Sequence, residues 1–283
     1  MKKYMVRFHG CPLRSIERSP EVTSRWSDSI PIHNNMKVAA IRTHKVTAKD
    51  RDLIKILDRY LLAFSENSIL AITSKIVSIT EGRLVKMDGV EKDELIKREA
   101  QYYLPRNQNP YNVSLTVTRN MLVATAGIDE SNGDGYYILW PENPQKTVNE
   151  VRSYLKKRFK LKNAGVIITD SKTTPLRWGV TSIALAYSGF KPLKDYIGKE
   201  DLFGRTFAFE KLSIIDSLAS SASVVMGEGA EQTPMAVISD LPFVEFQDRN
   251  PTDAELKELS ISMDRDLYGP FLENVQWKKG KGL

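Results

Sequence analysis

The sequence has very few of the side chains that bind transition metals or form disulfides. Cys11 is the only cysteine in 283 residues, and the three histidines are His9, His33 and His44. One cysteine cannot form an intrachain disulfide or a multi-cysteine metal site, and the histidines lack the spacing of a zinc site. A metal ion would therefore be held by carboxylates and other oxygens, which magnesium and manganese prefer.

Long hydrophobic runs are absent as well. No stretch approaches the ~20 apolar residues that are needed to span a bilayer. The basic first residues lack the apolar segment of a secretory signal. These features, with the single cysteine, predict a cytoplasmic protein without a membrane partner. Apolar residues make up 41% and charged residues 27% of the chain, which is typical of a globular protein with a substantial core.

The formal charge of +6 is moderate, and most of the lysines and arginines are spread along the chain. They cluster only at 156–160 and in the tail at 278–281. No motif that reads nucleic acid accompanies this charge, so we expect no nucleic-acid partner. Two interpretations of the basic clusters stay open, either solvated surface or a patch that receives a polyanionic substrate.

Residues 1–35 differ in composition from the rest of the chain. They are rich in Arg, Ser and Pro and show no sustained periodicity, whereas Met36 precedes an alternating apolar run. We interpret 1–35 as an N-terminal extension laid over the core or a partner subunit, with Met36 as an alternative start. Residues 36–283 are then expected to form one domain, or two closely packed subdomains.

The hydrophobic pattern after residue 36 mixes strands and helices without a strict β-α-β rhythm. Apolar and alternating runs predict strands at 38–41, 68–73, 113–118, 121–125 and 165–170. Helical spacing and capping residues predict helices at 50–64, 91–104, 143–155, 209–226 and 253–259. The strands at 113–118 and 121–125 should form a hairpin. The pattern as a whole predicts an α+β fold with mixed sheets and packed helices.

Acidic or amide side chains follow predicted elements at three places, where functional groups often lie. Asp129 and Asn132 follow one strand, Asp170 and Ser171 follow another, and Glu228 lies in a glycine-containing turn after the long helix. Two strand-end carboxylates and a third in such a turn favour a hard-cation site. The glycines of the turn, at 227 and 229, would let backbone N–H groups approach a phosphate.

Each of these features also has an ordinary structural explanation. A strand-end Asp is most often a turn former or a helix cap. A Gly-x-Gly after a helix is usually a C-cap, and Arg177 has the sequence context of a surface cation. Spacing alone therefore predicts no more than a divalent-metal and phosphate site.

Five blocks carry a more specific signal because they occur in a fixed order. They are Thr-Ser-Lys-Ile-Val-Ser at 73–78 with Glu-Gly-Arg at 81–83, Ala-Gly-Ile-Asp-Glu-Ser-Asn at 126–132, Asp170-Ser171 with Pro175, Arg177 and Gly179, Asp-Leu-Phe-Gly-Arg at 201–205, and Asp216 through Met226-Gly227-Glu228. In this order they resemble the coenzyme F420-0:γ-glutamyl ligase family, over roughly residues 37–240.

The resemblance implies an α+β γ-glutamyl ligase fold, a homodimer and a GTP-dependent reaction. In that reaction the carboxylate of an acceptor, F420-0 or a folate, receives the γ-phosphoryl group of GTP, and the amine of L-glutamate displaces phosphate from the acyl phosphate. The resemblance further implies two sites for Mg²⁺ or Mn²⁺, with K⁺ as an additional candidate cation.

The site residues carry over position by position. The resemblance assigns four residues to the divalent cations: Asp129, Asp170, Ser171 and Glu228. It assigns to GTP Ser74, Lys75, Asn132, Met226, Gly227, Glu228, Gly229 and Thr233. Lys75 and Arg177 would share the phosphate charge during catalysis.

The chain also departs from the family pattern. Ile79 stands at a position that is usually basic and contacts nucleotide, and 44–47 stand where an apolar stretch with a proline is common. Thr173 and Thr174 replace a usual Gly-Arg pair. Lys45 is a candidate replacement for the missing cation. These departures leave two alternatives to a ligase, an enzyme of phosphate hydrolysis or nucleotidyl transfer and a catalytically inactive relative that binds nucleotide and metal.

Overall fold

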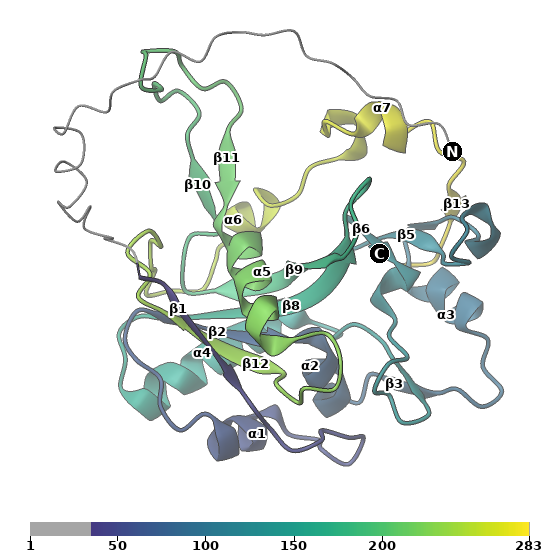
Figure 1. Cartoon of the computed structure of the whole chain (residues 1–283), viewed down its shortest axis with the longest axis horizontal. Coiled ribbons are helices and arrows are strands. Elements are labelled where there is room, and N and C mark those ends of the chain that lie inside the picture. The colour runs from purple at the N-terminus through teal and green to yellow at the C-terminus, as the bar shows by residue number, and fades with distance from the viewer. Residues whose placement is uncertain (1–34, 283) are drawn as a thin grey trace, which may run out of the picture. The chain divides into compact units, whose positions relative to one another are not determined.

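The computed structural model describes residues 35–282, which belong to one compact unit (Figure 1). The N-terminal extension expected at 1–35 lies outside the described residues, apart from its last position. Within the described range, no helix is both long enough and apolar enough to cross a membrane.

A five-stranded mixed sheet forms the centre of this unit (Figure 1). Its strands, in spatial order, are β1 (Lys37–Ile41), β12 (Met235–Ser239), β2 (Ser68–Thr73), β8 (Ala164–Thr173) and β9 (Val180–Ser188). Only β2 and β8 run parallel, and the other neighbours pair antiparallel. The parallel pair matters for the site because the carboxyl ends of both strands reach the same edge of the sheet.

Helices cover both faces of this sheet, which explains why its central strands are apolar throughout. Along β2, Leu70 and Ile72 pack on one side, while Ile69 and Ala71 pack on the other. The first side is covered by α1 (Leu53–Tyr60), α2 (Ser74–Glu81) and α4 (Pro144–Phe159). The second side is covered by α5 (Ile214–Met226). The strands at 38–41, 68–73 and 165–170 are confirmed.

A second group of strands lies beside the central sheet. A four-stranded sheet has the order β13 (Lys278–Lys279), β4 (Tyr102–Tyr103), β5 (Leu115–Thr118) and β6 (Met121–Ala124), and β3 (Leu84–Lys86) pairs with β7 (Tyr136–Ile138). Helix α3 (Lys92–Glu99) packs here on a small core of its own. The predicted hairpin is confirmed, and its turn residues Arg119 and Asn120 have positive φ angles of 50° and 60°.

The remaining elements are short. They are β10 (Leu193–Asp195), β11 (Lys211–Ser213), α6 (Asp253–Lys257), α7 (Gly269–Leu272) and the 3₁₀ turns η2 (Arg106–Gln108), η3 (Thr125–Gly127) and η4 (Met263–Arg265). Strands β10 and β11 pair as the base of a long hairpin, here called the arm (193–213), which projects from the body in Figure 1.

Four predicted helices are shorter in the structure than the periodicity indicates. The one predicted at 253–259 ends at Lys257 as α6. Asp52 caps α1, which ends at Tyr60 instead of continuing to 64. Helix α3 ends at Glu99, because Tyr102 and Tyr103 pair with β5. Helix α5 begins at Ile214 instead of 209, because 211–213 pair with β10. In the last two cases strand pairing with a distant segment overrides local helical spacing.

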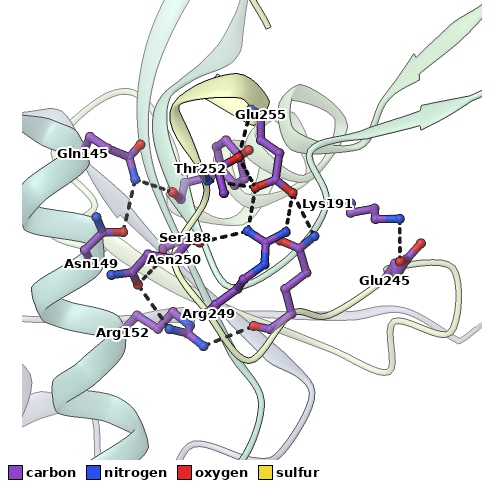
Figure 2. Close-up of polar contacts among 12 residues, drawn as sticks. Gln145, Asn149, Arg152, Ser188, Lys191, Glu245, Arg249, Asn250, Thr252 and Glu255 are labelled. Carbon is purple, nitrogen blue, oxygen red and sulfur yellow. Dashed lines mark hydrogen bonds and ion pairs between the residues drawn. The ribbon is translucent and has the colours of Figure 1, made fainter. Parts of the chain in front are cut away.

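The buried Arg152 ties α4 to the C-terminal segment. Its side chain donates hydrogen bonds to the carbonyl oxygens of Ala164 (3.2 Å) and Gln247 (3.1 Å), and to Oδ1 of Asn250 (3.2 Å). Figure 2 shows its guanidinium pointing into this cluster, where Ser188 also donates to Asn250 at 3.1 Å. Arg152 is only 4% exposed, so its guanidinium is held away from water.

Glu255 organises the neighbouring turn at the start of α6. Its carboxylate accepts from Nη1 and Nη2 of Arg249 at 2.6 and 2.7 Å and from the backbone N–H of Thr252 at 2.8 Å (Figure 2). The Arg249 hydrogen bonds hold the pKa of Glu255 well below its usual range, helped by Thr252 and Gln247 against a smaller opposing effect of burial.

We predict that Arg152→Ala lowers the free energy of unfolding by roughly 2–4 kcal/mol, because it leaves two carbonyl oxygens without a donor. Arg249→Ala is the matched control, since its partly exposed ion pair should contribute less than about 1 kcal/mol. Urea unfolding at neutral pH measures both. Equal losses in the two variants would contradict the structural role assigned to Arg152.

Glu255 should also shape the acid stability of the protein. Because its pKa is lowered in the fold, its contribution is present above the unfolded pKa of about 4.5 and is lost as pH falls. Glu255→Gln should therefore lose less stability than the wild type between pH 6 and pH 3. Urea unfolding across that range tests this, and parallel curves for the two proteins would show that Glu255 carries no such linkage.

Candidate functional site

A cavity of about 420 Å³ opens at the edge where β2 and β8 end. The start of α2, the loop after η3 and the turn after α5 meet around it. All the predicted site residues except Arg177 line this cavity: Ser74, Lys75, Asp129, Asn132, Asp170, Ser171, Met226, Gly227, Glu228, Gly229 and Thr233. The fold thus brings eleven of the twelve candidates together.

The parallel strand pair places the first two groups. Thr73 pairs with Thr169, so Ser74 and Asp170 follow at the same level. The Ser74 hydroxyl donates to Oδ1 of Asp170 at 3.1 Å, and the indole Nε1 of Trp140 donates to Oδ2 at 2.5 Å. Burial raises the pKa of Asp170 to about 6, against the lowering effect of these donors, and the charge of Asp129 adds to the rise.

A strained turn positions Asp129 at the cavity. Thr125, Ala126 and Gly127 all have positive φ angles, of 52°, 55° and 70°. Such a conformation costs on the order of 1 kcal/mol for a residue other than glycine. Hydrogen bonds to the neighbouring strand hold it in place, for the N–H of Ala126 donates to the Thr116 hydroxyl at 3.0 Å. Stored backbone strain of this kind is common at functional sites.

Lys75 forms an ion pair with Asp129 inside the cavity. Its Nζ lies 2.6 Å from Oδ2 of Asp129 and also donates to the carbonyl and hydroxyl oxygens of Ser131, at 3.1 and 3.0 Å. Burial alone would raise the pKa of Asp129, but the Lys75 ammonium and Ser131 outweigh it, so the pKa is lowered. The carboxylate of Asp129 is therefore anionic, and it is already paired with the ammonium group of Lys75.

The turn after α5 already surrounds an anion from its own chain. The N–H of Gly229 donates to Oε2 of Glu231 at 2.8 Å, and Gly227, with φ of 75°, lies against the same carboxylate. A side chain at 227 would collide with that carboxylate. Asn132 joins this turn to the Asp129 loop by donating to the carbonyl of Gly229 at 3.0 Å. The turn can thus accommodate a bound carboxylate or phosphate oxygen.

The donor groups fit a hard cation by their chemistry. In the described part of the chain no three His, Cys, Asp or Glu side chains are gathered as a ready metal cluster. Asp129, Asp170 and Glu228 nevertheless line one cavity, where their carboxyl groups are oxygen donors of the kind that hard cations prefer. Burial raises the pKa of Glu228, opposed by Ser171 and Lys75, while the charge of Asp129 raises the pKa of both other carboxyls. A bound cation would relieve this concentration of negative charge.

Arg177 is the one candidate that the fold places elsewhere. It is exposed in the turn between β8 and β9, and it does not line the cavity. Ile79, in contrast, is buried in the cavity wall at 4% exposure, and Lys45 lines the same cavity. His44, also in the lining, is fixed by contacts of its ring nitrogens with Tyr60 (2.8 Å) and Asp50 (2.9 Å).

Comparison with known families places this cavity in context. The model of the family described as F420-0:Gamma-glutamyl ligase matches residues 40–240, a range that includes every residue of the cavity. The chain belongs to this family. It is therefore an enzyme of the amide-forming γ-glutamyl ligase type, and the α+β fold class that its sequence predicts is confirmed.

Curated relatives of the ligase agree with the family match. The coenzyme F420:L-glutamate ligase of Methanopyrus kandleri is 36% identical over 194 residues, 62% of this chain and 76% of the relative. The protein of the same name from Methanococcus maripaludis strain C7 is 34% identical over 235 residues, 78% of this chain and 91% of the relative. That from Methanosarcina mazei is 30% identical over 233 residues, covering 76% and 85%.

Sequence reasoning missed one residue beside this candidate site. Trp140 contacts Asp170 directly but lies 30 positions away in the chain, just after β7. It belongs to none of the five ordered blocks. A buried tryptophan is usually a core residue, so only the tertiary contact marks it as part of the site.

Proposed function

We propose that this ligase joins L-glutamate to a carboxylate acceptor of the F420-0 or folate type, with GTP as the phosphoryl donor. The observation that carries the proposal is one cavity that combines four carboxylates, two lysines and an anion-accommodating glycine turn. Relatives named as coenzyme F420:L-glutamate ligases support L-glutamate and the F420-0 acceptor.

In the proposed reaction the acceptor carboxylate attacks the γ-phosphorus of GTP, and the bond from that phosphorus to the GDP oxygen breaks. The glutamate amine then attacks the acyl carbon of the acyl phosphate. Phosphate leaves with the bonding electrons, and the nitrogen loses a proton as the amide forms. Such a reaction depends on positioning and charge stabilisation, without a protein nucleophile.

Asp129, Asp170, Ser171 and Glu228 are the residues proposed to hold two divalent cations, Mg²⁺ or Mn²⁺, with K⁺ as a further candidate. When bound, these cations supply charge neutralisation for the phosphates. The residues themselves supply oxygen ligands on three separate segments that the fold brings to one cavity.

Lys75 and the glycine turn are proposed to bind the phosphates of GTP. Lys75 lies in the first turn of α2, where backbone N–H groups also favour an anion. In the turn, the position now taken by the Glu231 carboxylate is suited to a phosphate oxygen. The remaining proposed GTP contacts are Ser74, Asn132, Met226 and Thr233. Arg177 lies outside the cavity, so its catalytic role requires the β8–β9 turn to approach bound substrate.

Ile79 supports a second candidate, an inactive relative that binds nucleotide and metal. A buried apolar side chain lines the cavity where the family usually has a cation. Lys45 also lines the cavity, however, and brings a second lysine to its wall. The two candidates differ in product formation, which the assay below measures.

The exposed arm (193–213) supports a homodimer. Leu202, Phe203 and Phe209 are 97%, 94% and 84% exposed on this hairpin. Adjacent large apolar side chains on a projecting element are typical of a surface that is covered in an assembly. We propose a second copy of the chain as the occupant.

Purified protein with GTP, Mn²⁺, L-glutamate and either F420-0 or a folate should release GDP and phosphate and yield an acceptor heavier by one glutamyl unit. Asp129→Asn and Asp170→Asn should lower kcat/KM by about 10²–10³-fold, because each removes a negative charge proposed to hold the cations that neutralise the phosphates. Mass spectrometry of the acceptor measures the product.

Asp264→Asn is the matched control, since Asp264 is exposed on η4, away from the cavity. ATP in place of GTP, and EDTA in place of Mn²⁺, test the nucleotide and the cation separately. Nucleotide binding without any glutamylated product would favour the inactive relative. Phosphate release without an adduct would instead indicate hydrolysis.

The homodimer predicts that Leu202→Ser with Phe203→Ser shifts the protein from dimer to monomer, because the change removes apolar area from the arm. Sedimentation velocity gives the mass of each species. Leu176→Ser is the control, as Leu176 is equally exposed but lies on the β8–β9 turn. A monomeric wild type, or a dimer that persists in the double variant, would exclude the arm as the interface.

A further inference from the structure

The contact between Trp140 and Asp170 has features that core packing does not require. Trp140 is 3% exposed, and its Nε1 donates to Oδ2 of Asp170 at 2.5 Å, while Ser74 donates to the other carboxylate oxygen at 3.1 Å. An indole N–H can only donate a hydrogen bond. The indole N–H therefore fixes the position of one carboxylate oxygen of Asp170.

The surrounding backbone holds the indole in this position. The Arg83 side chain donates from Nε to the carbonyl of Trp140 at 3.0 Å, and the N–H of Leu139 donates to the carbonyl of Arg83 at 3.0 Å. Trp140 is thus fixed through its own main chain as well as through its ring. Its orientation does not depend on the Asp170 contact alone.

Gly127 provides the space that the indole occupies. A Cβ at this position would overlap Nε1, Cε2 and Cδ1 of Trp140, the part of the ring that carries the donor. Its φ of 70° adds a second reason for glycine, because L side chains rarely adopt that conformation. Gly127 lies two residues before Asp129, so the turn that positions one candidate ligand also admits the residue that orients another.

We propose that Trp140 is a positioning residue that orients Asp170 for cation binding, and that Gly127 makes room for its indole. This inference rests on the proposed function, since it takes Asp170 as a cation ligand. With Oδ2 held by the indole and Oδ1 by the Ser74 hydroxyl, the carboxylate of Asp170 keeps one orientation at the wall of the cavity. Hydrogen-bond donors that contact a metal-binding side chain fix the orientation of that side chain in this way. Their loss typically weakens metal binding about 10–100-fold.

Trp140→Phe tests the proposal because it keeps an aromatic ring and removes the N–H donor. Binding of Mn²⁺ alone, followed by the electron paramagnetic resonance signal of the free ion, should weaken about 10–100-fold relative to the wild type. Gly127→Ala should weaken it as well, since it retains the indole but displaces the donor. Gly127→Ala also allows the Mn²⁺ affinity to be measured if Trp140→Phe does not fold.

Leu155→Ala is the matched control, because it opens a cavity in the core under α4 without contacting Asp170. It should lower the thermal stability and leave the Mn²⁺ affinity unchanged. If both Trp140→Phe and Gly127→Ala bind Mn²⁺ with the affinity of the wild type, the positioning role is overturned, whereas the proposed metal site is not. A comparable loss in Leu155→Ala would overturn the positioning role too, by showing a general effect of stability. A wild type that binds no Mn²⁺ would overturn both this role and the proposed metal site.

Discussion

The parallel pairing of β2 and β8 is the constraint on which the site depends. Ser74 and Asp170 are 96 residues apart, yet the register of Thr73 with Thr169 puts them within hydrogen-bonding distance. The pairing requires both strands to be apolar on both faces, since helices cover the sheet on each side. The hydrophobic core and the polar edge of the cavity thus arise from the same two strands.

Electrostatic balance is the second organising feature of the cavity. Four carboxylates line a partly enclosed space, which is unfavourable unless cations or hydrogen-bond donors compensate. Lys75 compensates Asp129, and the two donors on Asp170 partly offset its burial. The charge of Asp129 raises the pKa of Asp170 and of Glu228, so the ionised forms of these carboxyls are disfavoured unless further positive charge is nearby. This repulsion is the physical basis for proposing divalent cations at this place.

Local patterns predicted the elements that make mostly local or fully buried contacts. The apolar runs at 68–73 and 165–170 are strands, and Asn143 with Pro144 opens α4. Periodicity was wrong where a segment pairs with a distant strand, as at Tyr102–Tyr103 and at 211–213, which pair with β5 and β10. The competing strand partner leaves no local sign in those residues, so their helical spacing was misleading.

The sequence by itself determined the residue types of the site and the family to which they belong, because five blocks in order carry that information without coordinates. The convergence of eleven candidates on one cavity, the position of Arg177 outside it and the contact of Trp140 with Asp170 were decided only by the tertiary structure. The physical reason is that these contacts join segments far apart in the chain. Such contacts depend on strand register and on the space left by Gly127. Neither of these features produces a repeating pattern in the sequence from which it could be predicted.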